Sequence, residues 1–585
     1  MRRESLAFAP FLDALERRLD ALTAAQLRQV LLDHAAGLPA AERGGFLALF
    51  EAGPAAPAPE GGSDQELVED VTAFLDEVAS GYYAEGDGFD PEYGEYRTFG
   101  DETWTIEFDG LLARAGRALL DDDPAVAREA YAGLLDALDG GYEGYFPGAG
   151  TPAELVSSDI REAKHRYLRA VWETEPLGTR AEAVVEAAED VAFVGGDPSL
   201  AAIEATTRAP LPDLETVLGD LGVHLAAVAG TGWGFGRQAQ QLLAEVTERY
   251  RGVDGLAELA RSAGDGQPGA YRDWVDGLAR AARMEEAEQA AVEALERMPA
   301  HGEVRATIAE RLAVLATVHG DGQQVLEARR AAWRADPTLA RLLSLVDVGT
   351  ALSSRDEVLA AEADQPAEGP LTDRAELAAA LLLLAHQVDD AIDLVRLADP
   401  FGWSSGIDRH PGPVVVPFLL LGAGDAASYD RFTDTLLFAL LDEANDVGWA
   451  YGGPGSEELA AFRALVGMAE DRPGRFEAIH RDHMILSAQL IEALAAHPPG
   501  HAERRHWLDV ACEVALERID AVVGGQHRGA YRRVALLAVA CAEAAALADG
   551  GEAGARFIAG CHTRHPRHTA FRRELRETAA QSPLL

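Results

Sequence analysis

The segment from Gly230 to Arg237 places four glycines directly before a helical pattern. They are Gly230, Gly232, Gly234 and Gly236, and Arg237 follows them. Glycines ahead of a helix N-terminus expose backbone N–H groups, which predicts a site for a small anionic ligand or a nucleotide. The spacing matches neither G-x-G-x-x-G nor G-x-x-x-x-G-K-[ST], and no strand pattern precedes it. A loop that only joins two helices is therefore the other interpretation.

A second set of candidate residues combines aromatic rings with carboxylates. Its members are Tyr82, Tyr83, Asp87, Asp90, Tyr93, Tyr96 and Trp104. Rings and carboxylates both attract cations, so this tract predicts contact with an arginine- or lysine-bearing segment of a partner. The spacing does not fit an EF-hand loop, which argues against calcium. The alternative is an irregular loop whose tyrosines pack onto the first helices.

A third set lies near the C-terminus and is unusually basic for this chain. It contains Arg564, Arg567, Arg572 and Arg573. These arginines predict contact with acidic groups, either on neighbouring helices or on a partner. The same tract contains the potential metal ligands Cys561, His562, His565 and His568. Pro566 interrupts their helical spacing and the arginines repel a cation, so we predict no metal site.

Few other patterns point to a reaction. The sequence has no H-E-x-x-H and no C-x-x-C. Because catalytic groups are brought together in space and not in sequence, an enzyme with an unrecognised site stays open as an alternative. We predict a protein that is not an enzyme and that needs no cofactor.

The charge of the chain excludes some partners. Its 585 residues carry a net charge of −46. Non-specific binding to nucleic acid requires cationic groups that displace counterions, so we expect no direct nucleic-acid partner. The same balance argues against docking on anionic membranes. Only one basic residue, Lys164, is a lysine; the rest are arginines, as in high-GC bacteria.

Cysteine content and apolar runs indicate the compartment. Three widely spaced cysteines do not form a disulfide framework, which favours a reducing compartment. The first residues contain no uncharged apolar run of the kind that a signal peptide needs. The longest apolar stretch, Pro413 to Ala423, is about half of a membrane span. We predict a soluble cytoplasmic protein, with this stretch forming a buried helix opened by Pro417.

The helical period dominates most of the chain, and no alternating run supports a sheet. Residues 1–51 read as a small helical unit, and residues 52–64, rich in Ala, Pro and Gly, read as a linker. Residues 65–265 form an irregular helical-repeat region, and residues 266–585 a more regular one. A chain this long needs several domains or one elongated array.

Small residues and prolines recur at matched places in the helical patterns. Residues 271–299 carry Ala287, Ala294 and then Pro299. A second copy carries Ala313, Ala332 and then Pro337, 38 residues after the first proline. Weaker copies have small or aromatic residues at corresponding places: Ala115, Ala127, Tyr131, Ala379, Ala391, Ala398, Ala553 and Phe557. The pattern resembles the tetratricopeptide repeat, whose period is about 34 residues, and the resemblance implies an all-α solenoid of helical hairpins.

A narrower resemblance concerns three segments, which include FLDALERRLDALTAAQLRQVLLDHA and CHTRHPRHTAFRRELRET. They are similar to the helical region of bacterial SWIM zinc-finger proteins. The SWIM finger needs a Cys-x-Cys pair, and this chain has none. The resemblance therefore implies a helical-repeat scaffold without zinc.

Together these observations favour a scaffold or adaptor that binds a protein or peptide partner on a helical-repeat surface. A regulator that senses a small anion or nucleotide through the Gly230–Arg237 loop is the first alternative.

Overall fold

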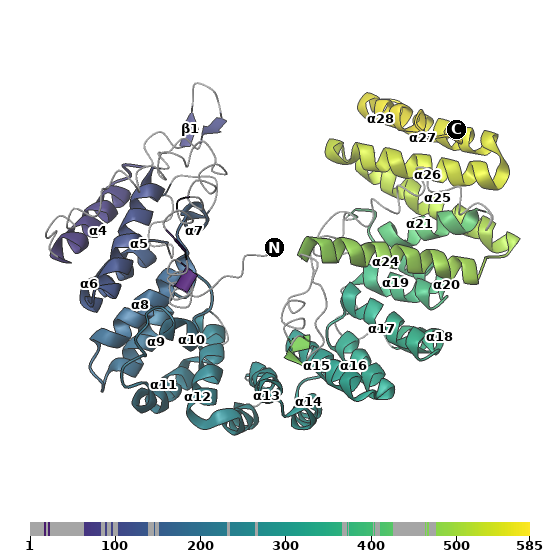
Figure 1. The fold of residues 1–585 in the computed structure, drawn as a ribbon. Coiled ribbons are helices and arrows are strands. Elements are labelled where there is room, and N and C mark those ends of the chain that lie inside the picture. Colours follow the sequence, from purple (N-terminus) through teal and green to yellow (C-terminus); the bar gives the residue numbers. More distant parts are fainter. Residues whose placement is uncertain are drawn as a thin grey trace. The chain divides into compact units, whose positions relative to one another are not determined.

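The computed structural model describes most of the chain from residue 64 onward (Figure 1). The described residues are 17–18, 22–23, 28, 64–83, 88–90, 95–97, 103–138, 146, 151–230, 234–263, 267–365, 371, 374–401, 403, 410–424, 462–463, 465–466 and 475–585. The predicted N-terminal helical unit and the predicted linker lie outside this set, apart from a few positions. The chain divides into two compact units, unit 1 (Met1–Asp273) and unit 2 (Trp274–Leu585), and each is described by itself.

Unit 1 consists mainly of helices. They are α4 (Asp64–Ala79), α5 (Trp104–Leu120), α6 (Pro124–Asp136), α7 (Pro152–Leu155), α8 (Ile160–Thr174), α9 (Arg180–Asp190), α10 (Leu200–Glu204), α11 (Leu214–Val228) and α12 (Phe235–Ala263). Helix α6 begins as its sequence predicts, because Pro124 needs no N–H partner and the Asp123 side chain accepts the Val126 N–H. Helix α12 is interrupted at Gly252, whose φ of 68° is left-handed.

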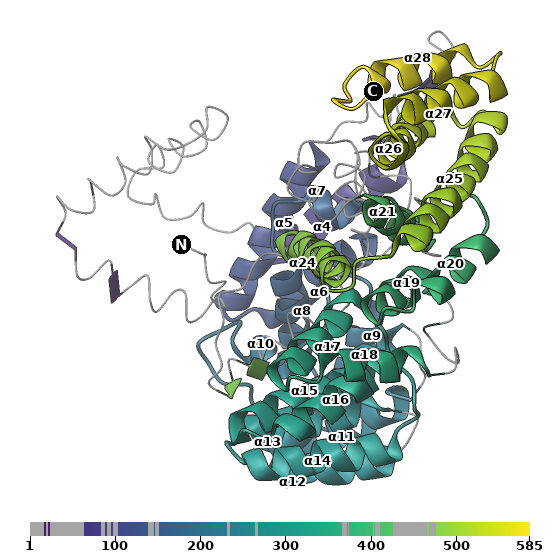
Figure 2. The same ribbon diagram turned by 90° about the vertical axis from the view of Figure 1, so that its right-hand side faces the viewer.

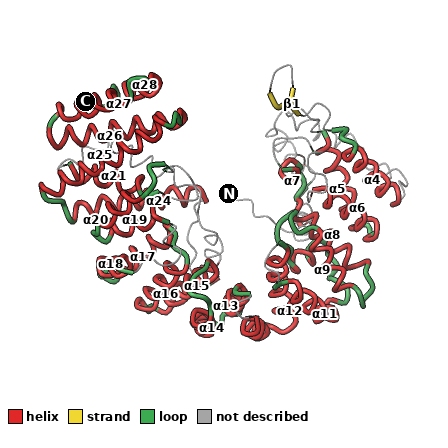
Figure 3. Tube along the Cα trace, turned by 180° about the vertical axis from the view of Figure 1, so that it is seen from behind, coloured by secondary structure: helices red, strands yellow, loops and turns green. Residues whose placement is uncertain are grey.

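One short antiparallel pair departs from the helical pattern. Strands β1 (Gly88–Asp90) and β2 (Glu95–Arg97) pair with Phe89 opposite Tyr96, and Figure 3 shows them in yellow. The sequence predicted no sheet. Strands of three residues are too short to show the alternation on which a strand prediction depends.

Unit 2 is built from helical hairpins. Its helices are α13 (Gly269–Arg280) from Trp274 onward, α14 (Met284–Arg297), α15 (Glu303–His319), α16 (Gly322–Ala335), α17 (Leu339–Ala351), α18 (Arg355–Ala363), α19 (Ala375–Leu384), α20 (Val388–Leu397), α21 (Gly412–Ala423), α24 (Arg475–Ala496), α25 (His501–Gly524), the 3₁₀ turn η4 (Arg528–Ala530), α26 (Tyr531–Asp549), α27 (Gly551–Arg564) and α28 (Thr569–Ala579). Successive helices pack on one another from α14 to α20, and α26 packs on α25, α27 and α28 (Figure 2).

The small residues singled out in the sequence lie where helices meet. Ala287, Ala294, Ala313 and Ala332 are all buried in α14, α15 and α16. In unit 1 and in the later hairpins, the matching residues Ala115, Ala127, Tyr131, Ala379 and Ala391 are also buried, whereas Ala398, Ala553 and Phe557 are half-buried. Alanine at such places lets two helix backbones approach closely. An all-α fold with repeat-like helical packing is thus confirmed for the described residues, with β1 and β2 as the exception.

The apolar stretch is a buried helix, but it begins earlier than predicted. Helix α21 starts at Gly412, so Pro417 lies in its interior and does not open it. The proline removes one helical hydrogen bond. Burial of almost every residue from Gly412 to Ala423 offsets that loss, because apolar burial contributes about 25 cal/mol per Å².

Two further observations concern the compartment. Among the described residues, no helix combines the length and apolar character needed to cross a bilayer. Cys512, Cys541 and Cys561 are free thiols, and Cys541 and Cys561 are buried.

Candidate functional site

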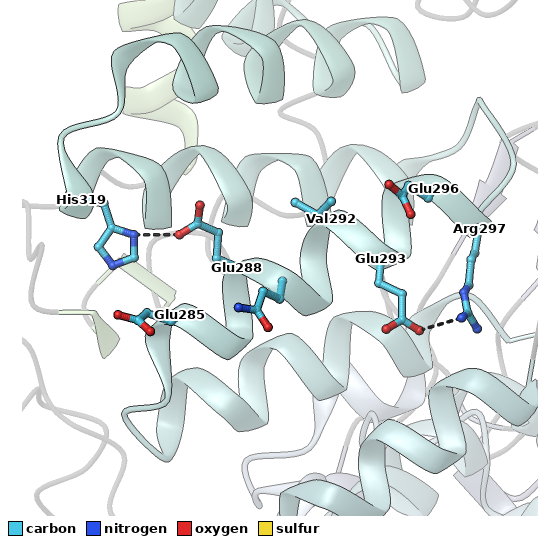
Figure 4. Close-up of a pocket in the computed structure, with 8 residues that line it drawn as sticks. Glu285, Glu288, Val292, Glu293, Glu296, Arg297 and His319 are labelled. Carbon is cyan, nitrogen blue, oxygen red and sulfur yellow. Dashed lines mark hydrogen bonds and ion pairs between the residues drawn. The ribbon is translucent and has the colours of Figure 1, made fainter.

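A hollow on the surface of unit 2 lies along α14 and reaches the end of α15 (Figure 4). We call it the acidic groove. Its volume is about 690 Å³, and it is lined by Glu285, Glu288, Gln289, Val292, Glu293, Glu296, Arg297 and His319. Seven of the eight residues come from α14, spaced three or four apart, so they share one face of that helix.

The opposite face of α14 explains why this face is free. Ala287, Ala290, Ala291 and Ala294 are buried against neighbouring helices. The glutamates therefore point away from the core. Val292, which lies among them, keeps 37% of its surface exposed and adds an apolar contact to a charged surface.

Two of the groove's four glutamates already have a partner. Glu288 Oε2 lies 2.7 Å from His319 Nδ1, and Glu293 Oε1 lies 3.3 Å from Arg297 Nη2 (Figure 4). Glu285 and Glu296 have no ion pair with any described residue. The groove therefore carries an excess of negative charge that a cationic ligand would neutralise.

The sequence reasoning did not single out these residues. The signal was present, because glutamates recur with helical spacing on the face opposite the alanines. Such a pattern also describes an ordinary solvated helix face. Only the position of His319, which comes from the next helix, shows that the face borders a hollow.

The aromatic and acidic tract is split by the structure. Tyr83 and Trp104 are buried, so these two rings offer no surface to a partner. The Tyr83 hydroxyl donates to Glu107 Oε2 at 2.8 Å, and its burial raises its pKa. Trp104 packs on Phe146, with ring centroids 4.4 Å apart.

The other members of this tract differ in what the structure describes. Tyr82 is 60% exposed and stands edge-on to Tyr83. Asp90 and Tyr96 lie in β1 and β2, and only their backbone is described. Asp87 and Tyr93 lie outside the described residues. Packing onto the first helices thus accounts for Tyr83 and Trp104, while partner contact by the remaining residues stays a prediction.

The glycine-rich loop joins α11 to α12, as the second interpretation of these residues proposed. Gly234 adopts a left-handed φ of 62° next to Phe193, and Gly236 is buried inside the first turn of α12. Gly230 follows the end of α11, and Gly232 lies outside the described residues. Arg237 is 83% exposed, with its guanidinium 3.9 Å from Asp197. An anion at this loop would have to compete with that carboxylate.

The basic C-terminal tract is partly neutralised within unit 2. Arg564 Nη2 lies 2.8 Å from Asp520, and Arg573 lies 3.6 Å from Glu574. Arg567 is exposed, and Arg572 points into a pocket between α27 and α28. Within the described part of the chain, no three His, Cys, Asp or Glu residues come together as metal ligands.

One short segment matches a catalytic pattern that is not among the predicted sites. Residues 402–406 read GWSSG, which fits G-x-S-x-G. In hydrolases this pattern places a serine on the turn between a strand and a helix. Here the preceding described element is helix α20, and Ser404 lies outside the described residues. The match therefore lacks the structural setting that the pattern needs.

Comparison with known proteins adds little to this description. No family model matches the sequence, and no curated protein matches it. Among solved structures, the chain is similar to a circular tandem repeat protein with a novel repeat topology and enhanced subunit contact surfaces. The identity is 13%, the match covers 82% of this chain and 95% of that one, and the TM-score is 0.17. A score this low carries no argument, so the packing of its own helices is what shows that the chain is a helical repeat protein.

Proposed function

We propose that this protein is a cytoplasmic scaffold that binds a positively charged segment of a protein partner in the acidic groove. The observation that carries the proposal is a long surface hollow on a regular helical hairpin, with carboxylates that the protein itself leaves without a cation. Helical repeats commonly present such surfaces to extended peptides.

The chemistry of the groove favours a peptide over a small cation. Its glutamates are spread along about three turns of α14, from Glu285 to Glu296, so neutralising them takes several charges on one chain. Val292 lies between them and suits the aliphatic part of an arginine or lysine side chain. A segment with basic residues at intervals would therefore satisfy the groove better than a single ion.

The test is direct binding of a labelled peptide that alternates arginine and alanine, followed by fluorescence anisotropy. The triple variant Glu285→Gln, Glu288→Gln and Glu296→Gln removes three charges from the groove. We expect its affinity to fall by at least about tenfold, because charge complementarity across the site is lost. Affinity of the unchanged protein should also fall with added salt.

A control is needed because the whole chain is acidic and attracts any basic peptide. Glu357, Glu517 and Glu552 are exposed on other helices, so changing all three to glutamine removes the same charge elsewhere. We expect this variant to lose less than about threefold in affinity. Equal losses in the two triple variants would show that the attraction is general and that the groove is not a site.

Three other proposals have weaker support from the structure. A regulatory site for an anion or nucleotide at the Gly230–Arg237 loop is supported by the exposure of Arg237 and weakened by Asp197 beside it. An enzyme with an unrecognised site has no supporting geometry among the described residues. Kinship to tetratricopeptide repeats is supported by the buried alanines of α14, α15 and α16 and by Pro337 after α16.

A further inference from the structure

A second hollow in unit 2, separate from the acidic groove, has the opposite character. We call it the basic pocket. It lies between α27 and α28, has a volume of about 440 Å³ and is lined by Ala559, His562, Thr569, Arg572 and Arg576. Its polar lining consists of two guanidinium groups, an imidazole and a hydroxyl, with no carboxylate.

Hydrogen bonds hold one guanidinium group in place. Arg572 Nε donates to His562 Nδ1 at 3.4 Å, and Arg572 Nη1 donates to the Pro566 carbonyl at 3.2 Å. Arg576 Nε donates to the Arg572 carbonyl at 3.1 Å, one helical turn away. The remaining guanidinium N–H groups of both arginines have no protein acceptor among the described residues.

The imidazole supplies a third donor. His562 Nδ1 accepts a hydrogen bond from Arg572, so the ring proton of the neutral form lies on Nε2. Burial, Arg572 and Arg576 together lower the pKa of His562, which favours this neutral form. The ring therefore offers an N–H donor and adds no positive charge to those of the neighbouring Arg572 and Arg576.

The absence of a carboxylate is unusual in this chain. It has 97 acidic residues for 51 basic ones, and other arginines of the same tract do find partners, such as Arg564 with Asp520. Neither Arg572 nor Arg576 forms an ion pair with a described residue. Two like charges one turn apart repel each other, so an anion between them would relieve that repulsion.

We propose that the basic pocket binds the phosphate group of a small phosphate monoester. Arginine forks, a ring N–H and a hydroxyl converge on it from two helices, which matches the several acceptor oxygens of a phosphate. Its volume exceeds that of a bare ion and falls in the range of small-molecule sites, so an organic part fits beside the phosphate. This inference does not depend on the acidic groove.

The experiment is calorimetric titration of the full chain with inorganic phosphate, ribose 5-phosphate and ribose. We expect ribose 5-phosphate to bind more tightly than inorganic phosphate, and ribose not to bind. The double variant Arg572→Gln and Arg576→Gln should bind ribose 5-phosphate with at least about tenfold lower affinity, because two charge-assisted contacts are lost. The affinity of the double variant Arg572→Lys and Arg576→Lys should lie between those of the unchanged protein and the glutamine variant. Lysine keeps the positive charge but lacks the forked guanidinium group.

Two single variants serve as matched controls. Arg573→Gln changes an exposed arginine on the same helix that is paired with Glu574, and Arg237→Gln tests the glycine-rich loop. Both should bind as the unchanged protein does. Hydrogen exchange in peptides covering α27 and α28 should slow on binding and also shows that the variants are folded.

Several results would overturn the proposal. One is no binding of ribose 5-phosphate at roughly 10 mM, where even a weak site would be occupied. Another is equal binding by the double glutamine variant and the unchanged protein. Tighter binding of a phosphoserine peptide than of ribose 5-phosphate would reject the small-molecule assignment.

Discussion

Buried positive charges are held in different ways in the two units. In unit 1, Lys164 is fully buried, and its ammonium group donates to the carbonyls of Val194 and Gly196 at 3.1 and 2.8 Å. Arg169 is also buried; it donates to the carbonyls of Ala209 and Pro210 and pairs with Glu173 on its own helix at 2.6 Å. These partners lie in the loops after α9 and α10. The buried cations of unit 1 therefore hold irregular loops against α8.

In unit 2, two buried arginines join helices one hairpin apart, while buried Arg518 donates to the Pro400 carbonyl at 3.0 Å. Arg311 on α15 forms two hydrogen bonds with Asp276 on α13, at 2.5 and 2.8 Å. Arg341 on α17 lies 3.1 Å from Glu310 on α15. The partners are 35 and 31 residues apart, close to one helical-hairpin repeat.

The two units differ in which groups accept hydrogen bonds from their buried cations. Where hairpins repeat, a carboxylate on one hairpin faces an arginine on the next, and the pair fixes their register. Longer loops contain backbone carbonyls that have no N–H partner in a helix. A buried cation can donate hydrogen bonds to several of these carbonyls at once. Four substitutions test this comparison, and hydrogen exchange of peptides from each unit of the full chain measures the effect of each.

The largest effect is expected for Arg341→Met in unit 2. The change removes the guanidinium that pairs with buried Glu310 and with Asp336, so that Glu310 keeps only the weaker attraction of Arg329, and it should cost about 3 to 5 kcal/mol of opening free energy around α15 and α17. Adding Glu310→Leu should restore part of the loss, because it removes the uncompensated charge. A double variant less stable than Arg341→Met would contradict the pairing.

Lys164→Met in unit 1 should cost somewhat less, about 2 to 3 kcal/mol. The change leaves the carbonyls of Val194 and Gly196 and the Gln238 side-chain oxygen without this donor. Protection should fall in α8 and in the loop at 194–196, with unit 2 unchanged. Arg117→Met, at an exposed position of α5, is the control and should have little effect.

Lowering the pH should decrease the folding stability of both units, because each contains a buried histidine that stays neutral in the folded state. Burial, with Lys164 and Arg161 nearby, lowers the pKa of His165 from 6.5 to about 4, and the ring accepts the Ser199 N–H. The unfolded chain therefore binds a proton between these values that folded unit 1 does not. Stability is complete above pH 6.5 and falls as the pH decreases toward 4, by about 2 kcal/mol at pH 5.

The variant His165→Gln sharpens this result, because it keeps an acceptor for Ser199 and cannot be protonated. We expect it to flatten the pH dependence of unit 1 between pH 7 and pH 5. Unit 2 should keep its own dependence, since burial lowers the pKa of His410 to about 4 as well. Unchanged pH dependence of unit 1 in this variant would show that other groups titrate.

The smallest effect is expected for Arg334→Ala in unit 2. Arg334 is half exposed and pairs with Glu362 at 2.8 Å, but Arg330 lies 3.3 Å from the same carboxylate. Since the second arginine keeps Glu362 neutralised, the loss should stay below about 1 kcal/mol. A loss as large as that of Arg341→Met would mean that a half-exposed pair fixes the register too.

Sequence patterns predicted the helices and the alanines between them, because both follow from a period of 3.6 residues within one segment. They did not place the start of α21 or the pair of short strands. Pro417 is tolerated inside its helix only because the surroundings are apolar, and the chain alone does not show those surroundings.

The candidate sites were harder to predict for a related reason. The acidic groove needs His319 beside α14, and the basic pocket needs His562 and Arg576 from two helices. The predicted basic tract included Arg572; His562 was named only as a potential metal ligand, and Arg576 was not named. The buried role of Trp104 also depends on Phe146, 42 residues away. Each is a fact of tertiary packing, which no local spacing encodes.

The burial of Lys164 has a practical consequence. It carries the chain's one ε-amino group, and that group is shielded in folded unit 1. A reagent that acylates lysine side chains should therefore leave it untouched until α8 separates from the loops it holds. The rate at which this position is acylated, measured by peptide mass, would therefore report the rate at which unit 1 opens.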